Sequence, residues 1–184
     1  SSTIAREADG VLYTWAGPEI SVATTKAYSA QLSALYLISV KIARVRGLIS
    51  IGDERALCAE LQRLPECIEQ TLKCQSDMQR IATLYANRSS VFFLGRGLDY
   101  AAALEASLKL KEISYIHSEA YAAGELKHGT ISLIEEGTLV VALATQPALF
   151  EKTVSNIREV VARGASVVLV TTDDFTGDES VCQH

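Results

Sequence analysis

The sequence predicts an α/β fold in which a parallel β-sheet is flanked by helices. Short apolar runs with the length of buried strands occur at 91–94, 138–144 and 166–171. Two stretches that we expect to be helices, at 99–113 and 147–163, separate these runs. Because strands that alternate with helices pair in parallel through right-handed connections, the second half of the chain is expected to form one such layer.

The residue pattern in the first half of the chain predicts a strand followed by a long helix. Residues 11–15 are β-branched and aromatic, which favours a short strand, and Gly17 and Pro18 end it. Apolar residues then recur at helical spacing from 19 to 46, and Gly47 is placed to cap this helix. The helix is mostly apolar, so we expect it to pack on two sides.

Two more helices are expected before residue 88. Asp53 is placed to cap the first helix, and Pro65 is expected to end it and to begin the second. The second helix runs to about residue 86 and is rich in Glu, Gln and Lys on one face. Residues 51–88 are therefore predicted to be a helical connector between two lobes.

The turn Gly95-Arg96-Gly97 follows the first buried strand of the second half. A dinucleotide-binding fingerprint needs a third glycine, and Tyr100 occupies that position, so neither NAD nor FAD is expected. The two glycines instead favour a tight connection from the strand to the next helix. Gly164 is placed to cap the later helix at 147–163.

Composition and charge exclude several classes of protein. The 184 residues include 17 Lys and Arg against 22 Asp and Glu, which gives a net charge of -5. Nucleic-acid binding is driven by clustered basic side chains, so we expect no nucleic-acid partner. There is no uncharged apolar stretch of the roughly 18 residues that a membrane span needs, and residues 1–10 do not resemble a signal peptide.

The cysteines predict neither a disulfide framework nor a metal site. None of the four forms a CxxC pair or lies at zinc-finger spacing from a histidine. We interpret them as reduced thiols of a cytoplasmic protein that holds no metal or cofactor. They are Cys58, Cys67, Cys74 and Cys182.

The polar residues that could carry chemistry concentrate between 104 and 129. Glu105, Lys109 and Glu112 are spaced to share one face of the helix at 99–113. One interpretation is a solvated stripe of salt bridges. The other is that Glu112 acts as a general base. The helix dipole disfavours a carboxylate in the last turn, whereas Lys109 favours one, so the sequence leaves the charge state of Glu112 open.

After this helix, a glycine-flanked segment carries Glu125, Lys127 and His128 and is expected to be a loop. A carboxylate base together with a histidine suits proton transfer next to a carbonyl group. His117 and His128 are eleven positions apart, which is not the spacing of a metal-binding pair.

Three stretches of the chain resemble one family in order along nearly the whole sequence. They are AGPEISVATTKAY at 16–28, FLGRG at 93–97 and ASLKLKEISYIHSEAYAAGELKHG at 106–129. They are similar to the isomerase region of the glucosamine-6-phosphate synthases, the isomerizing glutamine–fructose-6-phosphate aminotransferases. The resemblance implies sugar isomerase (SIS) lobes with flavodoxin-like or Rossmann-like layers.

The resemblance also implies an activity and roles for five residues. The family converts fructose 6-phosphate to glucosamine 6-phosphate, as the first step of hexosamine synthesis, with ammonia from a glutaminase domain. By motif match, Glu112 moves a proton between C1 and C2, Lys109 lies beside the sugar hydroxyls, and His128 opens the sugar ring from the neighbouring subunit of a homodimer. Val22 and Thr24 match positions that touch the sugar.

Other motifs of the family are missing from this sequence. They are the Ser/Thr-rich phosphate loops of the first lobe, the Schiff-base lysine near the C-terminus and the cysteine of the glutaminase domain. We therefore expect the end of an incomplete first SIS lobe at 1–50, the connector at 51–88 and the first part of an incomplete second lobe at 89–184. This chain alone is expected to be inactive. A non-catalytic SIS module that binds sugar phosphates, and a fragment that only supplies a dimer surface, are the alternatives.

Overall fold

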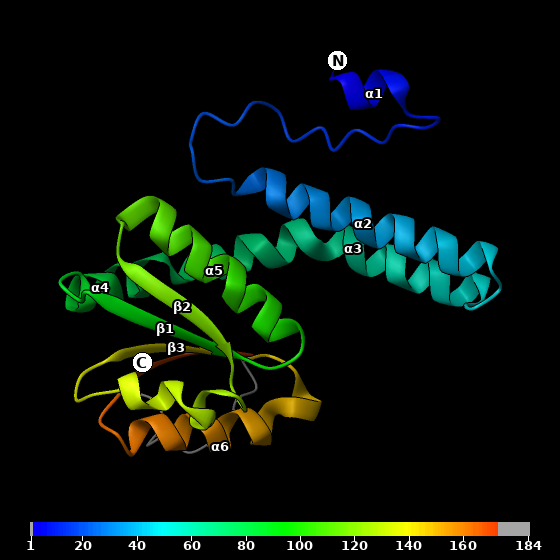
Figure 1. The fold of residues 1–184 in the computed structure, drawn as a ribbon. Coiled ribbons are helices and arrows are strands. Elements are labelled where there is room, and N and C mark those ends of the chain that lie inside the picture. Colours follow the sequence, from blue (N-terminus) through cyan, green and yellow to red (C-terminus); the bar gives the residue numbers. More distant parts are fainter. Residues whose placement is uncertain (1, 173–184) are drawn as a thin grey trace. The chain divides into compact units, whose positions relative to one another are not determined.

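The computed structural model describes residues 2–172 and divides the chain into two compact units, 1–76 and 77–184 (Figure 1). Within residues 2–172, no helix combines the length and the apolar character that crossing a membrane requires. Cys58, Cys67 and Cys74 are free thiols, and Cys182 lies outside the described residues.

Unit 1 consists of helices. Its elements are α1 (Thr3–Glu7), α2 (Lys26–Val45), α3 (Ile51–Thr71) and the short 3-10 helix η1 (Leu72–Cys74). The connection from α2 to α3 is set by local signals. Gly47 has a φ of 69°, and the amides of Gly47 and Leu48 donate to the carbonyls of Arg44 and Ala43, which is the Schellman arrangement. The prediction that Gly47 ends this helix is therefore confirmed.

Two predictions about the start of unit 1 are wrong. Residues 11–15 form no strand, because β-propensity alone cannot replace a partner strand that pairs with the backbone. Helix α2 begins at Lys26 rather than at residue 19, and the intervening residues are irregular. Only the later part of the apolar pattern is therefore helical.

Two predictions about α3 are also wrong. Ser50, not Asp53, is the N-cap residue: its hydroxyl accepts from the Asp53 amide at 3.1 Å, and the Asp53 carboxylate accepts from the Ser50 amide at 2.8 Å. This is a capping box. Helix α3 also continues through Pro65, because Leu61, Leu64 and Ile68 keep their helical spacing along a groove that α2 also lines.

Unit 2 is built on a sheet of four parallel strands with helices on both faces, which confirms the predicted α/β class (Figure 1). The strands lie in the order β2-β1-β3-β4. In chain order the elements are α4 (Gln75–Tyr85), β1 (Ser90–Gly95), α5 (Leu98–Ser114), β2 (His117–Ala122), η2 (Leu126–His128), η3 (Thr130–Leu133), β3 (Leu139–Ala144), η4 (Pro147–Leu149), α6 (Phe150–Val161) and β4 (Ser166–Thr171).

The two faces of this sheet carry separate cores. Phe92 and Leu94 of β1 point to the face that is covered by η2, η3 and α6, whereas Val91 and Phe93 point to the face covered by α4 and α5. This alternation follows from the two-residue period of a strand. The predicted buried strands at 91–94, 138–144 and 166–171 correspond to β1, β3 and β4.

Strand β2 (His117–Ala122) was not predicted, because no element was expected at residues 117–122. The segment alternates polar and small residues, and it forms an edge strand of the sheet. An edge strand needs no continuous apolar run, so the pattern that identifies a buried strand is absent. Its register nevertheless matches β1 along the full length, from Ser90 opposite His117 to Gly95 opposite Ala122.

Candidate active site

Helix α5 brings three charged side chains of the predicted site together. The Lys109 ammonium donates to Glu112 Oε2 at 2.6 Å and lies 3.4 Å from Glu105 Oε1. All three side chains are partly buried, with exposed fractions of 19% for Lys109, 24% for Glu105 and 28% for Glu112. The spacing that predicted a shared helix face is therefore confirmed, and the stripe is only partly solvated.

The start of α5 is fixed by a turn that only glycine allows. A Cβ atom on Gly95 would lie 2.4 Å from the carbonyl carbon of Asp99, and Gly97 has a φ of 55°. Asp99 is buried, and its carboxylate accepts from the Thr145 amide at 2.9 Å and from the Thr145 hydroxyl at 2.5 Å. The predicted tight connection is confirmed, and it anchors α5 to the end of β3.

The middle of α5 is anchored to β2. The buried Ser107 and Ser118 hydroxyls lie 3.1 Å apart, and Ser118 Oγ also donates to the Ser107 carbonyl at 2.8 Å. Tyr115 ends the helix in the left-handed conformation with a φ of 62°. Because α5 is held to the sheet at its start and at its middle, the sheet fixes the direction in which Lys109 and Glu112 face.

The electrostatics of this group favour a charged lysine. The hydrogen bond to Glu112 is the largest cause that raises the pKa of Lys109, and the charge of Glu112 and the hydrogen bond and charge of Glu105 add to it, while burial opposes them. Lys109 therefore stays protonated at neutral pH. A carboxylate beside a fixed ammonium can accept a proton from a substrate while the ammonium stabilises a developing negative charge on oxygen.

His128 does not lie with this group. It is an exposed residue at the end of η2, and the neighbouring Leu126 belongs to the core that η2, η3 and α6 form on one face of the sheet. Helix α5 packs through Ala103 and Leu110 on the other face. The sheet therefore separates His128 from Glu112 within one chain.

Val22 and Thr24 belong to unit 1, ahead of helix α2. Val22 is exposed in the irregular segment before α2, and Thr24 is partly buried next to the buried Ala23. The Thr24 hydroxyl can contact a ligand, and Val22 can offer only apolar surface and its backbone.

The carboxyl ends of the strands carry a polar cluster that the sequence reasoning did not assign. The Arg96 guanidinium donates to Asn156 Oδ1 of α6 at 2.7 Å and 3.2 Å, and Gln146 Nε2 donates to the Arg96 carbonyl at 2.6 Å. The glycines around Arg96 were the available signal, but its contact with Asn156 depends on the tertiary fold. This cluster ties the loops after β1 and β3 to α6.

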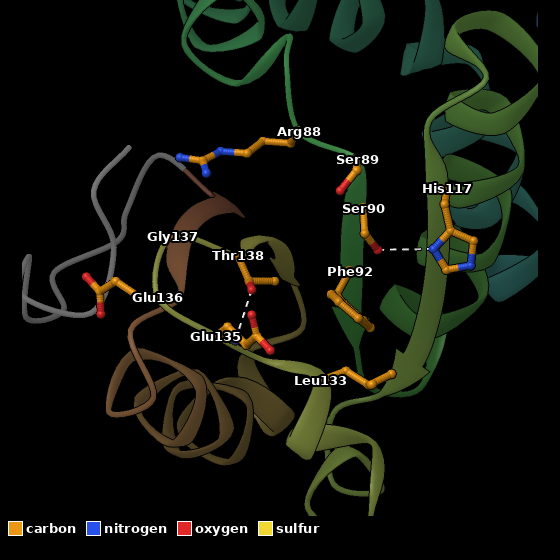
Figure 2. Close-up of a pocket in the computed structure, with 10 residues that line it drawn as sticks. All are labelled: Arg88, Ser89, Ser90, Phe92, His117, Leu133, Glu135, Glu136, Gly137 and Thr138. Carbon is orange, nitrogen blue, oxygen red and sulfur yellow. Dashed lines mark hydrogen bonds between the residues drawn. The ribbon is translucent and has the colours of Figure 1, made fainter.

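A pocket of about 430 Å³ lies at the opposite edge, near the amino ends of β1, β2 and β3 (Figure 2). Ser90 Oγ and His117 Nδ1 lie 3.1 Å apart on its wall, and the Glu135 amide donates to Thr138 Oγ1 at 2.9 Å. Ligands of open α/β sheets usually bind at the carboxyl ends of the strands, so we assign no role to this pocket. Across residues 2–172, no group of three or more His, Cys, Asp or Glu side chains is arranged to hold a metal ion.

Comparison with known families gives a match to the SIS domain over residues 84–178. Two relatives with high identity are both glutamine–fructose-6-phosphate aminotransferases (isomerizing). The protein of Caldanaerobacter subterraneus subsp. tengcongensis is 59% identical over 167 residues, which cover 91% of this chain and 28% of the relative. The protein of Symbiobacterium thermophilum is 56% identical over 183 residues, which cover 100% of this chain and 30% of the relative.

A solved structure agrees with these matches. The C-terminal domain of glucosamine-fructose-6-phosphate aminotransferase from Francisella tularensis superposes with a TM-score of 0.90 at 39% sequence identity. The superposition covers 92% of this chain and 48% of that domain. The chain therefore spans less than a third of the two relatives and about half of the similar solved domain.

Proposed function

The chain belongs to the SIS domain family, and from this premise we propose that it is part of the isomerase region of an enzyme that makes glucosamine 6-phosphate. Its substrates are fructose 6-phosphate and ammonia from a glutaminase domain of the same enzyme. The observation that carries this proposal is the Lys109–Glu112 pair, held at 2.6 Å on α5 within the longest stretch that resembles the family. The names and identities of the relatives support it.

In this proposal Glu112 is the catalytic base. Its carboxylate takes a proton from C1 of the open-chain sugar and returns it to C2, which converts a ketose into an aldose derivative. The C1–H bond breaks, a C2–H bond forms, and Glu112 ends in the charge state in which it began. Lys109 supports the step because its ammonium can hydrogen-bond to an oxygen on which negative charge develops.

His128 is proposed to open the sugar ring in the active site of a second copy. The support is geometric: η2 and α5 lie on opposite faces of the same sheet, so one chain does not present His128 and Glu112 to one substrate. A site that uses both residues therefore needs two chains, which favours a homodimer. Closed two-fold dimers are the commonest protein oligomers.

The remaining assignments are proposals on the same basis. Val22 and Thr24 would contact the sugar from the first lobe, which we place at 1–50. The connector would be 51–88 and the second lobe 89–184, and the SIS match at 84–178 supports the last of these. A cytoplasmic location fits an enzyme that acts on phosphorylated sugars. The bound group is the substrate itself, and the proposed proton transfer needs no cofactor.

The test is an assay of fructose 6-phosphate conversion by the full enzyme that contains this chain, together with exchange of the C1 proton with solvent. Glu112→Gln is expected to reduce both rates by about 10²–10⁴-fold, the usual contribution of a general base, and to leave sugar binding intact. Glu151→Gln makes the same chemical change at an exposed position of α6 and should leave both rates unchanged.

Two outcomes would contradict the proposal in different ways. Unchanged proton exchange in Glu112→Gln would reject Glu112 as the base. Tight sugar-phosphate binding by the full protein without any turnover would instead favour the alternative, a non-catalytic SIS module.

A further inference from the structure

The Lys109 ammonium lies between two carboxylates, although a single carboxylate would be enough to balance its charge. Glu112 Oε2 is 2.6 Å away, and Glu105 Oε1 is 3.4 Å away on the other side along α5. Both carboxylates and the ammonium are partly buried, so their contacts are screened less than those of a fully exposed pair. The group as a whole carries one excess negative charge when all three side chains are ionised.

This arrangement matters when Glu112 changes its charge. In the proposed reaction Glu112 becomes neutral between taking the proton from C1 and returning it to C2, and the substrate holds the electron pair of the broken bond. A neutral carboxylic acid attracts an ammonium much less than a carboxylate does. Glu105 Oε1 is already within reach of the Lys109 ammonium at 3.4 Å, so a small movement of the Lys109 side chain shortens and strengthens this contact.

We propose that Glu105 is a positioning residue that holds the charged Lys109 beside the sugar while Glu112 carries the substrate proton. The inference rests on the proposed function, because it assigns Glu105 to the same site. Glu105 does not exchange a proton in this scheme: Lys109 moves closer to Glu105 while Glu112 is neutral and returns when Glu112 is charged again. The alternative is that Glu105 is only one member of a surface salt-bridge stripe.

The first test measures Lys109 directly and needs no enzyme activity. The pKa of Lys109 is followed by NMR of carbon-labelled lysine in this chain, and Lys109→Arg identifies its signal. Four proteins are compared: the wild type, Glu105→Gln, Glu112→Gln and the double variant. Glu112→Gln imitates the neutral base, and each single change removes one of the two carboxylates that raise the pKa of Lys109.

We expect Glu105→Gln to lower the pKa of Lys109 in both backgrounds, because a carboxylate favours the charged form of a nearby amine. The fall should be about one pH unit in the Glu112→Gln background and smaller in the wild type, where Glu112 holds the ammonium. An equal fall in the two backgrounds, or no fall in Glu112→Gln, would overturn the proposal. Glu151→Gln is the matched control and should leave the pKa of Lys109 unchanged.

The second test uses the full enzyme. Glu105→Gln is expected to lower kcat, to leave the KM for fructose 6-phosphate nearly unchanged and to move the basic limb of the pH profile to lower pH, because Lys109 then loses its proton more easily. Glu105→Asp keeps the charge and should restore the position of that limb. If Glu105→Gln lowers activity by the same factor at every pH and leaves the pH profile unchanged, Glu105 has a merely structural role.

The two proposals can fail separately. If the wild-type full enzyme does not convert fructose 6-phosphate, the proposed function is wrong, whatever the NMR titration shows. If the wild type is active and the titration shows no dependence of Lys109 on Glu105 in the Glu112→Gln background, only the inference about Glu105 is wrong.

Discussion

The two units of this chain use their apolar residues in opposite ways. Within residues 2–172, every buried apolar side chain except Ala23 belongs to unit 2, where two cores cover the two faces of the sheet. In unit 1 no residue of α2 is buried, and many of its large apolar side chains are exposed, among them Leu35, Leu37, Ile38 and Ile42. The packing of side chains that are distant in sequence therefore stabilises unit 2. In unit 1, local signals such as the Gly47 turn and the Ser50 capping box set where the helices end and begin.

The largest effect that this comparison predicts concerns one leucine in each unit. Leu94 is 0% exposed in β1, and Leu37 is 46% exposed in α2. Leu94→Ala should lower the free energy of unfolding by about 2–5 kcal/mol, because it removes buried methyl groups and leaves a cavity. Leu37→Ala should change it by roughly 0.5 kcal/mol or less. Urea denaturation followed by circular dichroism measures the free energy of unfolding of both variants. Equal losses of stability in the two variants would contradict the difference between the units.

A smaller effect is expected where α5 begins. Gly95→Ala places a Cβ atom 2.5 Å from the Asp99 carbonyl oxygen and 2.6 Å from the Tyr100 nitrogen, so the backbone of this turn must shift. We expect a loss of about 1–3 kcal/mol, comparable to overpacking a core. Gly10→Ala in unit 1 is the control, since its Cβ atom would meet nothing within 4 Å. A Gly95 variant as stable as the Gly10 variant would show that the turn is not tight.

The smallest effect concerns the local signal that begins α3. Ser50→Ala removes the hydroxyl of the capping box and should cost about 1 kcal/mol, as N-cap replacements usually do. The loss should appear in unit 1 alone. Amide hydrogen exchange in α3 and in β1 separates the two units, and faster exchange in β1 would contradict the local nature of this cap.

The same cap predicts a dependence on pH. The hydrogen bonds from the Ser50 hydroxyl and amide hold the pKa of Asp53 below its ordinary value of 3.8. Because the pKa of Asp53 is lower in the folded protein than in the unfolded chain, its carboxylate stabilises the folded state above pH 3.8. This stabilisation is lost as the pH falls through the pKa that Asp53 has in the folded protein. In Ser50→Ala the pKa of Asp53 should rise toward 3.8, which an NMR titration of its carboxyl carbon measures.

The elements that could be predicted from the sequence are those with a strong pattern of apolar residues. Strands β1, β3 and β4 are continuous apolar runs, and α6 has clear helical periodicity. Strand β2 could not be found because His117, Glu119 and Tyr121 alternate with small residues at a sheet edge. The segment at 11–15 shows the opposite error: its residues favour a strand, but a strand exists only where a partner pairs with it.

Only the part of the candidate site that follows from one regular pattern was predictable from the sequence. Lys109 and Glu112 are three residues apart on one helix, so their contact follows from helical spacing alone. Glu112 and His128 are close in sequence, but sequence spacing alone does not show on which face of a sheet each residue lies. The undetected strand β2 lies between them in the chain and η2 packs on the other face of the sheet, so helical spacing could not reveal this separation.

Complementation between two inactive chains tests the central claim most directly. Glu112→Gln and His128→Ala versions of the full enzyme are mixed, allowed to exchange subunits and assayed for fructose 6-phosphate conversion. If His128 acts across subunits, random mixed dimers each regain one intact site, and activity returns to about a quarter of the wild-type value. Mixtures that remain as inactive as the separate variants would contradict the account, because they would place both residues in the site of a single chain.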